Sequence, residues 1–287
     1  PFRIHATYDE SISRMLNVFE EVNREIPFKG TNWFFDHCET ISDRSLERVK
    51  ALGGGIAIQD RMAFQGEYFL DRYGSKAAER TPPVRRMLDL GIPVGAGTDA
   101  TRVASYNPWL SLYWLVAGKT VGGTALYSEA NCLSREEALM LYTKGSSWFS
   151  GESGKKGALA PEQLADLVVL TDDYLSVPEE QIKSIESVLT MVDGKIVHAT
   201  DEFASHTPPP IPVLPEWSPV KVFGGYGAPL DVRKAARAGV PMPQHQHNAE
   251  CHHHGCVHTG HQLLAGIEAA GNRYAAFFGS GCDCFAF

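Results

Sequence analysis

Three residues of types that bind metals each follow a short apolar segment, and they lie far apart in the sequence: His5, His37 and Asp99. Two imidazoles and one carboxylate suit zinc or a related divalent ion, and a set of three ligands leaves a position for water. Taken singly, each residue has a plainer interpretation as a hydrogen-bonded core histidine or a helix-capping aspartate. Because the spacing is too long for a local motif, the metal-site hypothesis depends on the elements that position these residues.

The stretch that ends at Asp99 predicts one half of a βαβ unit. Residues 82–90 have the pattern of a helix with Thr81 as its N-cap, and Gly91 ends it. The apolar residues 92–94 that follow predict a buried strand bounded by glycines. An acidic residue just past the carboxyl end of such a strand lies where α/β barrels have their active-site residues.

Three earlier strands are expected, at residues 3–6, 33–39 and 56–59. A helix should follow the first strand behind a capping box formed by Thr7 and Glu10. Ser42 can cap the helix after the second strand, and a polar and aromatic loop is expected over residues 60–74. Strands thus alternate with helices four times in units of roughly 25 to 35 residues, which indicates a parallel sheet with helical cover.

The pattern changes after the fourth strand. Asn107 is expected to cap a helix, and Ser134 with Glu137 forms a second capping box. A strand and then a β-hairpin with an Asp193-Gly194 turn come next. These later strands indicate a small β unit that is separate from the alternating part.

The composition is that of an ordinary globular protein: the chain has 287 residues, of which 44% are hydrophobic and 21% are charged. A formal charge of −8 argues against a broad nucleic-acid surface, and no apolar run approaches the ~18 residues of a membrane span. Cys38 and Cys132 are isolated, which is not the pattern of a small disulfide-stapled domain. The cytoplasm is the expected location; because the chain starts at Pro1, its natural beginning is expected to lie upstream, and a signal peptide stays open.

Two other patterns near the predicted site have weaker support. Gly95, Gly97 and Ala100 match a loose dinucleotide fingerprint, but no helix with an apolar face follows and no acidic strand end comes ~20 residues later. Cys38 follows His37, but it is better explained as a buried free thiol, since no separate activating base is evident.

A second cluster of soft ligands lies in the tail, where five residues fall within one short run: Cys251, His252, His254, Cys256 and His258. Ligands this close together can capture Zn, Cu or Ni. The alternative is a tail without fixed structure that binds metal only incidentally, and the residues alone do not decide between the two.

Together these residues resemble the amidohydrolase superfamily, specifically its amidohydrolase family 3 branch, over residues 4–199. His5 and the segment 36–39 are similar to the family's metal histidines of the fifth and sixth barrel strands, and residues 97–99 to its eighth-strand aspartate. The helix after the barrel and the return into a composite β-sandwich are matched by three further segments: residues 136–143, residues 157–170 and the Asp193-Gly194 hairpin.

The resemblance implies an α/β fold in three parts. Residues 1–155 would form a partial metal-dependent (β/α)8 barrel, about the last four strand–helix units. Residues 156–200 would form part of the composite β-sandwich, and residues 201–287 a Pro-rich linker and a His- and Cys-rich tail. Family members begin with the other half of the sandwich and a first strand that carries a His-x-His pair, none of which precedes His5. The chain therefore resembles the C-terminal half of an enzyme, whose activity we expect to require the N-terminal half.

The resemblance also implies a metal-dependent hydrolase that cleaves a non-peptide C–N bond, in an amide or cyclic amide, by attack of a metal-activated water. His5, His37 and Asp99 would hold one or two divalent ions, with Zn²⁺ expected, and Asp99 would also act as general acid and base. Loop residues at the same edge are expected to contact a small amide-type substrate: Gln59, Arg61, Tyr106 and Asn107. Neither nucleic acid nor membrane is expected as a partner, and a homo-oligomer is one option.

The competing hypothesis is non-enzymatic. The chain would then be a catalytically incomplete fragment that binds or delivers metal through its His- and Cys-rich tail. Sequence upstream of the first residue would discriminate, since a His-x-His pair after a short strand favours the enzyme.

Overall fold

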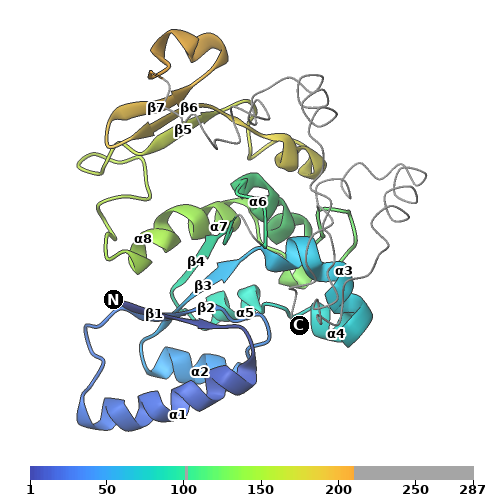
Figure 1. Cartoon of the computed structure of the whole chain (residues 1–287), viewed down its shortest axis with the longest axis vertical. Coiled ribbons are helices and arrows are strands. Elements are labelled where there is room, and N and C mark those ends of the chain that lie inside the picture. Colours follow the sequence, from blue (N-terminus) through green and yellow to red (C-terminus); the bar gives the residue numbers. More distant parts are fainter. Residues whose placement is uncertain (101–102, 210–287) are drawn as a thin grey trace, which may run out of the picture. The chain divides into compact units, whose positions relative to one another are not determined.

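Two sheets organise the chain, whose computed structural model describes residues 1–100 and 103–209 (Figure 1). The larger is parallel, has the order β1-β2-β3-β4, and consists of β1 (Phe2–Ala6), β2 (Trp33–His37), β3 (Gly55–Gln59) and β4 (Val94–Gly97). The smaller is antiparallel, has the order β5-β6-β7, and consists of β5 (Leu167–Leu170), β6 (Ser187–Val192) and β7 (Lys195–Ala199). The predicted α/β fold with a parallel sheet is therefore confirmed.

Helices connect the parallel strands and continue after them. Those between the strands are α1 (Asp9–Glu25), α2 (Asp43–Ala51), α3 (Arg61–Tyr73), α4 (Ser75–Ala78) and α5 (Val84–Asp89). Those after β4 are α6 (Pro108–Ala117), the 3-10 helix η1 (Glu129–Asn131), α7 (Arg135–Met140), the π-helix η2 (Leu141–Gly145) and α8 (Ser146–Phe149). Two 3-10 helices accompany the smaller sheet: η3 (Glu179–Ser184) and η4 (Asp201–His206). Each helix of the described residues is too short or too polar to span a membrane.

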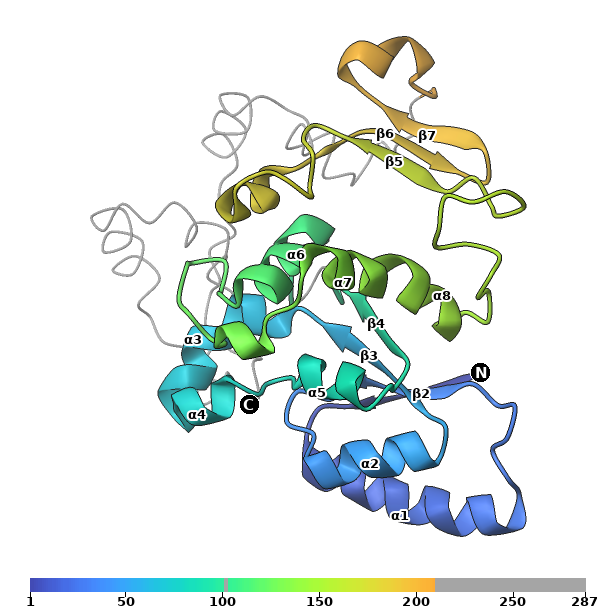
Figure 2. The same ribbon diagram turned by 180° about the vertical axis from the view of Figure 1, so that it is seen from behind.

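Alternating side chains of β2 give the parallel sheet two covered faces. Trp33 and Phe35 point to the side of α1, where the ring of Phe19 lies 5.1 and 5.9 Å from theirs. Phe34 points the other way and meets the ring of Phe149 in α8 at 4.7 Å. Successive residues of a strand face opposite sides, so helices are needed on both. Figures 1 and 2 show α1 and α2 on one side of the sheet and α7 and α8 on the other.

The register of the parallel sheet brings the ends of its strands to one edge. Ala6 of β1 lies opposite His37 of β2, and Gln59 of β3 lies opposite Gly97 of β4. Strand β4 ends later than predicted, because its glycines continue the ladder to β3. Asp99 consequently follows only a short step beyond the strand, at the same edge as the ends of β1 and β2.

The prediction of a loop over residues 60–74 is wrong, because α3 occupies most of this segment. Met62 and Phe69 are buried on one face of the helix. Gly66, between them, lies so close to the side chain of Leu126 that a Cβ would meet it at 2.7 Å. The helical spacing of the buried residues is present in the sequence, but intervening polar and aromatic residues obscure it.

Three predicted helix caps are confirmed. The Ser42 hydroxyl accepts a hydrogen bond from a backbone N–H in the first turn of α2, and the Asn107 side-chain oxygen does the same for α6. Ser134 and Glu137 form the complete reciprocal capping box of α7. Each of these caps joins residues close in sequence, so local residue types were sufficient to predict them.

Two predicted caps are wrong. The first turn of α1 is held from the loop after β2 rather than by Thr7, because the backbone N–H of Asp9 donates to the Oγ1 of Thr40 at 3.2 Å. Thr81 does not cap α5, because its hydroxyl donates to the carbonyl of Ala77 at 2.7 Å and the helix begins later. In both places another part of the fold provides or takes the hydrogen bond.

The hairpin of the smaller sheet is confirmed. Strands β6 and β7 pair antiparallel around Asp193 and Gly194, whose φ angles are 51° and 73°. Positive φ at both turn residues matches the right-handed twist of the strands. This sheet falls within residues 156–200, while its membership of a β-sandwich and the boundaries of the three parts stay predictions. Residues 210–287 lie outside the described residues.

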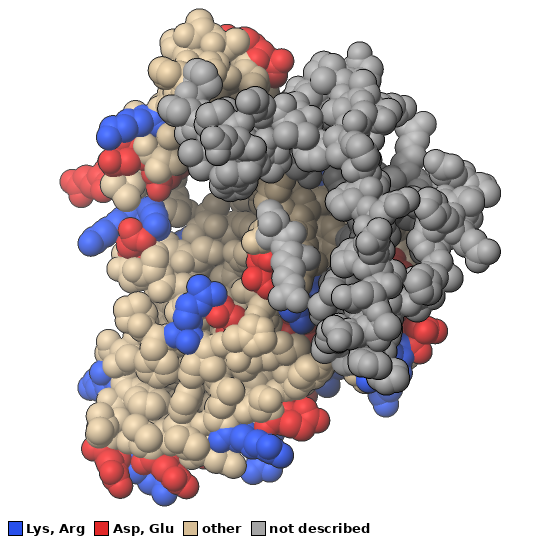
Figure 3. All heavy atoms as spheres, viewed as in Figure 1, with Lys and Arg blue, Asp and Glu red and all other residues tan. Residues whose placement is uncertain are grey.

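Charged side chains of both signs are interspersed on the face that Figure 3 shows. Ion pairs join several charged side chains of the described residues, such as Arg48 with Glu20 and Arg85 with Glu137, both at 2.6 Å. Neither sign therefore dominates the described part of that face.

Candidate active site

His5 and His37 lie side by side at the carboxyl ends of adjacent strands. Their ring centroids are 4.3 Å apart and the ring planes meet at 68°. The side chain of His37 is only 5% exposed, whereas His5 is exposed. The parallel pairing of β1 with β2 thus brings together two of the three predicted metal ligands, although 31 residues separate them in the sequence.

The backbone is unusual at the strand ends that carry the predicted ligands. His37, Cys38 and Asp99 have φ angles of 77°, 56° and 51°, in the left-handed region that non-glycine residues seldom occupy. Such conformations persist only where the surrounding structure holds them, and they cluster at functional sites. Two of the three predicted ligands therefore occupy held, unfavourable backbone positions.

The electrostatic surroundings keep the His37 ring neutral. Burial, and then the neighbouring His5 and Arg61, lower the pKa of His37 to about 4, while Asp99 and Asp36 oppose the shift. A neutral imidazole is the form that binds a metal ion. The predicted metal role of His37 therefore needs no loss of a proton near neutral pH.

The complete predicted ligand set is not gathered in one place. No group of three or more His, Cys, Asp and Glu side chains among residues 1–100 and 103–209 comes close enough to hold a metal ion. The charge of Asp99 reaches His37, but its side chain is exposed, so Asp99 stays a predicted third ligand beside the His5–His37 pair. The five predicted ligands of the tail, Cys251, His252, His254, Cys256 and His258, lie outside the described residues.

Two buried carboxyl groups follow the ends of β2 and β3, and the sequence patterns did not single out either one. Glu39 and Asp60 are 1% and 0% exposed, and among the described residues no oxygen of either side chain has a hydrogen-bond partner. Burial raises the pKa of Glu39 to about 7, against the lowering effect of Arg61, and it raises the pKa of Asp60 to about 8. Asp60 directly follows β3 and Glu39 lies two residues after β2, and these positions are the signal that could have identified them.

The predicted substrate contacts differ in their surroundings. Gln59 is buried at the end of β3, and its side-chain oxygen has no hydrogen-bond partner. Arg61, in the first turn of α3, reaches to 3.8 Å from the Oε1 of Glu39. Tyr106 is 52% exposed, and the Asn107 side-chain oxygen caps α6. Contact of these four residues with a substrate stays a prediction.

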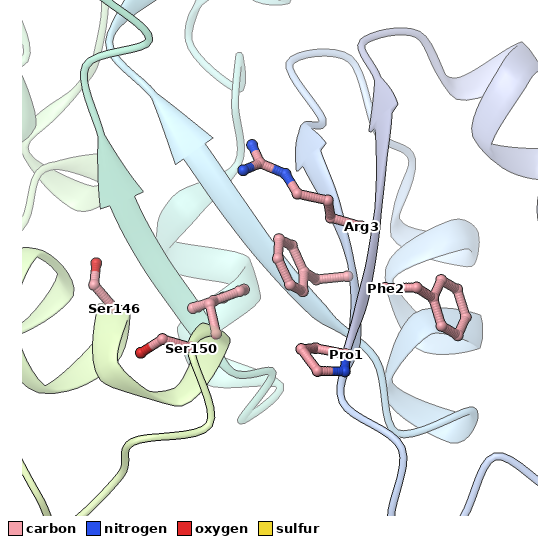
Figure 4. A pocket seen from close by; sticks show the side chains of 7 residues that line it. Pro1, Phe2, Arg3, Ser146 and Ser150 are labelled. Carbon is pink, nitrogen blue, oxygen red and sulfur yellow. The ribbon is translucent and has the colours of Figure 1, made fainter.

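A cavity of about 600 Å³ opens beside the carboxyl ends of β1 and β2, lined by the loops that follow these strands and by α3 and α4. Tyr8 belongs to its lining and has a buried hydroxyl without a hydrogen-bond partner. A smaller cavity of about 370 Å³ lies at the opposite ends of the strands, between Pro1 and Arg3 of β1 and Ser146 and Ser150 near α8 (Figure 4). The larger cavity is therefore the one on the side of the histidine pair.

Residues 1–198 of the chain match the protein family described as the amidohydrolase family. The chain belongs to this family. The resemblance inferred from the strand-end motifs is thereby confirmed, and the matched residues include both His5 and His37.

The chain is similar to two curated proteins. The chain is 25% identical over 199 residues to the putative amidohydrolase YtcJ of Bacillus subtilis (strain 168), a match that covers 68% of the chain and 37% of the relative. It is 26% identical over 193 residues to the N-substituted formamide deformylase of Arthrobacter pascens, covering 67% and 35% respectively. The chain thus spans little more than a third of the length of these relatives.

A similar solved structure is that of an uncharacterized metal-dependent hydrolase from Pyrococcus horikoshii OT3. The two chains share 27% identity with a TM-score of 0.52, over 62% of this chain and 35% of that chain. The similarity therefore extends to the fold of most of the described residues.

Proposed function

We propose that this chain carries part of the active site of a metal-dependent hydrolase that cleaves a non-peptide C–N bond, in an amide or cyclic amide. The observation that carries the proposal is the His5–His37 pair, with ring centroids 4.3 Å apart at adjacent strand ends. The family supports hydrolysis, and the names of two relatives, a metal-dependent hydrolase and an N-substituted formamide deformylase, support the metal and the substrate class.

The residues present fit a divalent metal ion. The pKa of His37, lowered to about 4, keeps one imidazole in its ligand form, and its Nδ1 is a buried polar atom without a hydrogen-bond partner. His5 and His37 would hold the ion, with Asp99 as a third ligand and zinc as the expected metal. When bound, such an ion lowers the pKa of a coordinated water towards ~7 and polarises a carbonyl group.

Asp99 would handle the proton of the reaction. Its exposed carboxylate, held in a left-handed turn just beyond β4, accepts the proton of the attacking water and gives it to the departing nitrogen. A carboxylate that serves first as base and then as acid needs access to both groups, and its exposure provides that. Gln59, Arg61, Tyr106 and Asn107 are proposed to orient the substrate from the same edge.

Asp99→Asn tests the proton role. We expect this variant to lose turnover of N-substituted formamides or cyclic amides by more than ~100-fold while it still binds zinc, because an amide offers an oxygen ligand but cannot carry the proton. The assay uses this chain and longer forms of the protein that contain it. Asp193→Asn, in the β6–β7 turn, is the control. Activity of Asp99→Asn within tenfold of the parent would exclude Asp99 as the base.

A further inference from the structure

Two charged side chains, those of Glu39 and Arg61, follow one another beside the buried ring of His37. Its Nδ1 is 3.9 Å from the Oε1 of Glu39, and the Nε of Arg61 is 3.8 Å from that same oxygen. The side chains of His37, Glu39 and Arg61 are 5%, 1% and 15% exposed. The order is therefore imidazole, carboxylate and guanidinium, in a region that is nearly closed to solvent.

The facing atoms of His37 and Glu39 lack other partners. Neither the Nδ1 of His37 nor either carboxylate oxygen of Glu39 has a hydrogen-bond partner among the described residues. An N–H···O hydrogen bond spans about 2.7 to 3.2 Å, so a movement of roughly 1 Å completes one between them. Buried polar atoms without partners are energetically unfavourable, so a hydrogen bond between the Nδ1 of His37 and the Oε1 of Glu39 would be stabilising.

We propose that Glu39 is the positioning residue of His37: its carboxylate accepts a hydrogen bond from the Nδ1–H group of the ring. The proton stays on Nδ1, and Nε2 is then the metal-binding atom. This inference rests on the proposed function, because it assumes that His37 is a metal ligand. A metal-bound histidine usually donates its other ring N–H to a carboxylate or carbonyl, which sets both the tautomer and the direction of the ring. Glu39 is placed to do this for His37.

The backbone and Arg61 hold Glu39 in this place. The left-handed turn at His37 and Cys38, with φ of 77° and 56°, lets the chain double back so that Glu39 faces the ring two residues before it. The Arg61 charge lowers the pKa of Glu39 and so opposes the effect of burial. Arg61 therefore favours the ionised form of Glu39, and this role adds to the substrate contact that was predicted for Arg61.

The tautomer of His37 tests the proposal directly. In the metal-free, ¹⁵N-labelled full chain, NMR distinguishes the Nδ1–H form from the Nε2–H form, and the signals of His37 are those lost in His37→Gln. We expect Nδ1–H in the parent and in Glu39→Gln, whose amide oxygen still accepts the proton. Glu39→Ala is expected to shift the ring towards Nε2–H.

Zinc affinity provides the second measurement. We expect Glu39→Ala to bind zinc about 10- to 100-fold more weakly, with Glu39→Gln weakened less. Glu20→Ala is the matched control, because Glu20 also pairs with an arginine, Arg48 at 2.6 Å, but far from His37 in the sequence. It should change neither the tautomer of His37 nor the zinc affinity. Zinc held elsewhere in the chain is measured with the His5→Ala/His37→Ala double variant.

The outcomes separate this inference from the function on which it rests. An Nε2–H tautomer in the parent, or an unchanged tautomer and zinc affinity in Glu39→Ala, would overturn the positioning role. If Glu39→Ala does not fold, the parent tautomer decides by itself. Zinc affinity equal in the parent and the His5→Ala/His37→Ala variant would overturn the proposed metal site, and the inference with it.

Discussion

Replacing Asp60 by asparagine should stabilise the metal-free chain at neutral pH and change little in acid. Asp60 is fully buried between β3 and α3, and neither carboxylate oxygen has a hydrogen-bond partner among the residues that the structure describes. Burial, reinforced by the negative charge of Asp99, raises its pKa from the ordinary 3.8 to about 8. At pH 7 the unfolded chain has an ionised Asp60, so folding must take up a proton there.

The size of the effect follows from the width of this pH window. Between pH 3.8 and about 8 the folded state binds the proton and the unfolded state does not, so the free energy of unfolding falls as the pH rises. Each pH unit inside the window is worth about 1.4 kcal/mol, and the cost therefore reaches about 4 kcal/mol at pH 7. Asparagine has nearly the same shape and no proton to take up, so Asp60→Asn removes the cost.

Urea unfolding of the parent and Asp60→Asn, both treated with a chelator, measures this difference. Between pH 5 and pH 7 the advantage of the variant should grow by about 3 kcal/mol, because groups that titrate in both proteins cancel. At pH 7 its melting temperature should be about 5 to 10 °C higher. Asp172→Asn, at an exposed position, should follow the parent at every pH. A difference between Asp60→Asn and the parent that is constant with pH would mean that Asp60 is already ionised in the folded chain.

Two further predictions concern stability. Glu137→Gln should lower the free energy of unfolding by about 1 kcal/mol at pH 7, a modest value because Glu137 is 38% exposed. The Arg85 guanidinium lowers the pKa of Glu137 to about 2, so this loss should fade as the pH falls from 4.5 to about 2. A loss in urea unfolding that persists at pH 2 would contradict this. Gly145→Ala should lower the free energy of unfolding by about 1 to 3 kcal/mol, because its Cβ would clash with the carbonyl oxygen of Val94. Gly97→Ala is the control and should unfold like the parent, because a Cβ there meets no described atom within 4 Å. Equal urea midpoints for Gly145→Ala and the parent would refute this packing argument.

Local signals were sufficient for much of the fold. Short apolar runs marked the four parallel strands, and Ser42 and Ser134 were correct caps because their partners lie within one helical turn. Thr7 failed as a cap because Thr40, far along the chain, holds the first turn of α1 instead. Such a partner becomes available only when β1 and β2 pair, and residue spacing does not reveal it.

The candidate site shows the same difference between local signals, which the sequence carries, and contacts that only folding creates. The juxtaposition of His5 and His37 follows from residue type and strand-end position, both of which the sequence carries. The importance of Glu39 and Asp60 comes from their burial, which depends on the packing of the neighbouring elements. With residues 60–74 expected as a loop, Asp60 looked like an exposed turn residue, and nothing indicated a raised pKa.

The most direct test of the account is the position of a bound zinc ion. Crystals of the full chain grown with zinc, measured on both sides of the zinc absorption edge, locate the ion by its anomalous scattering. The account predicts a peak bonded to a ring nitrogen of both His5 and His37, at about 2.0 to 2.1 Å from each. Zinc found only elsewhere in the chain, with both rings free of metal, would contradict it.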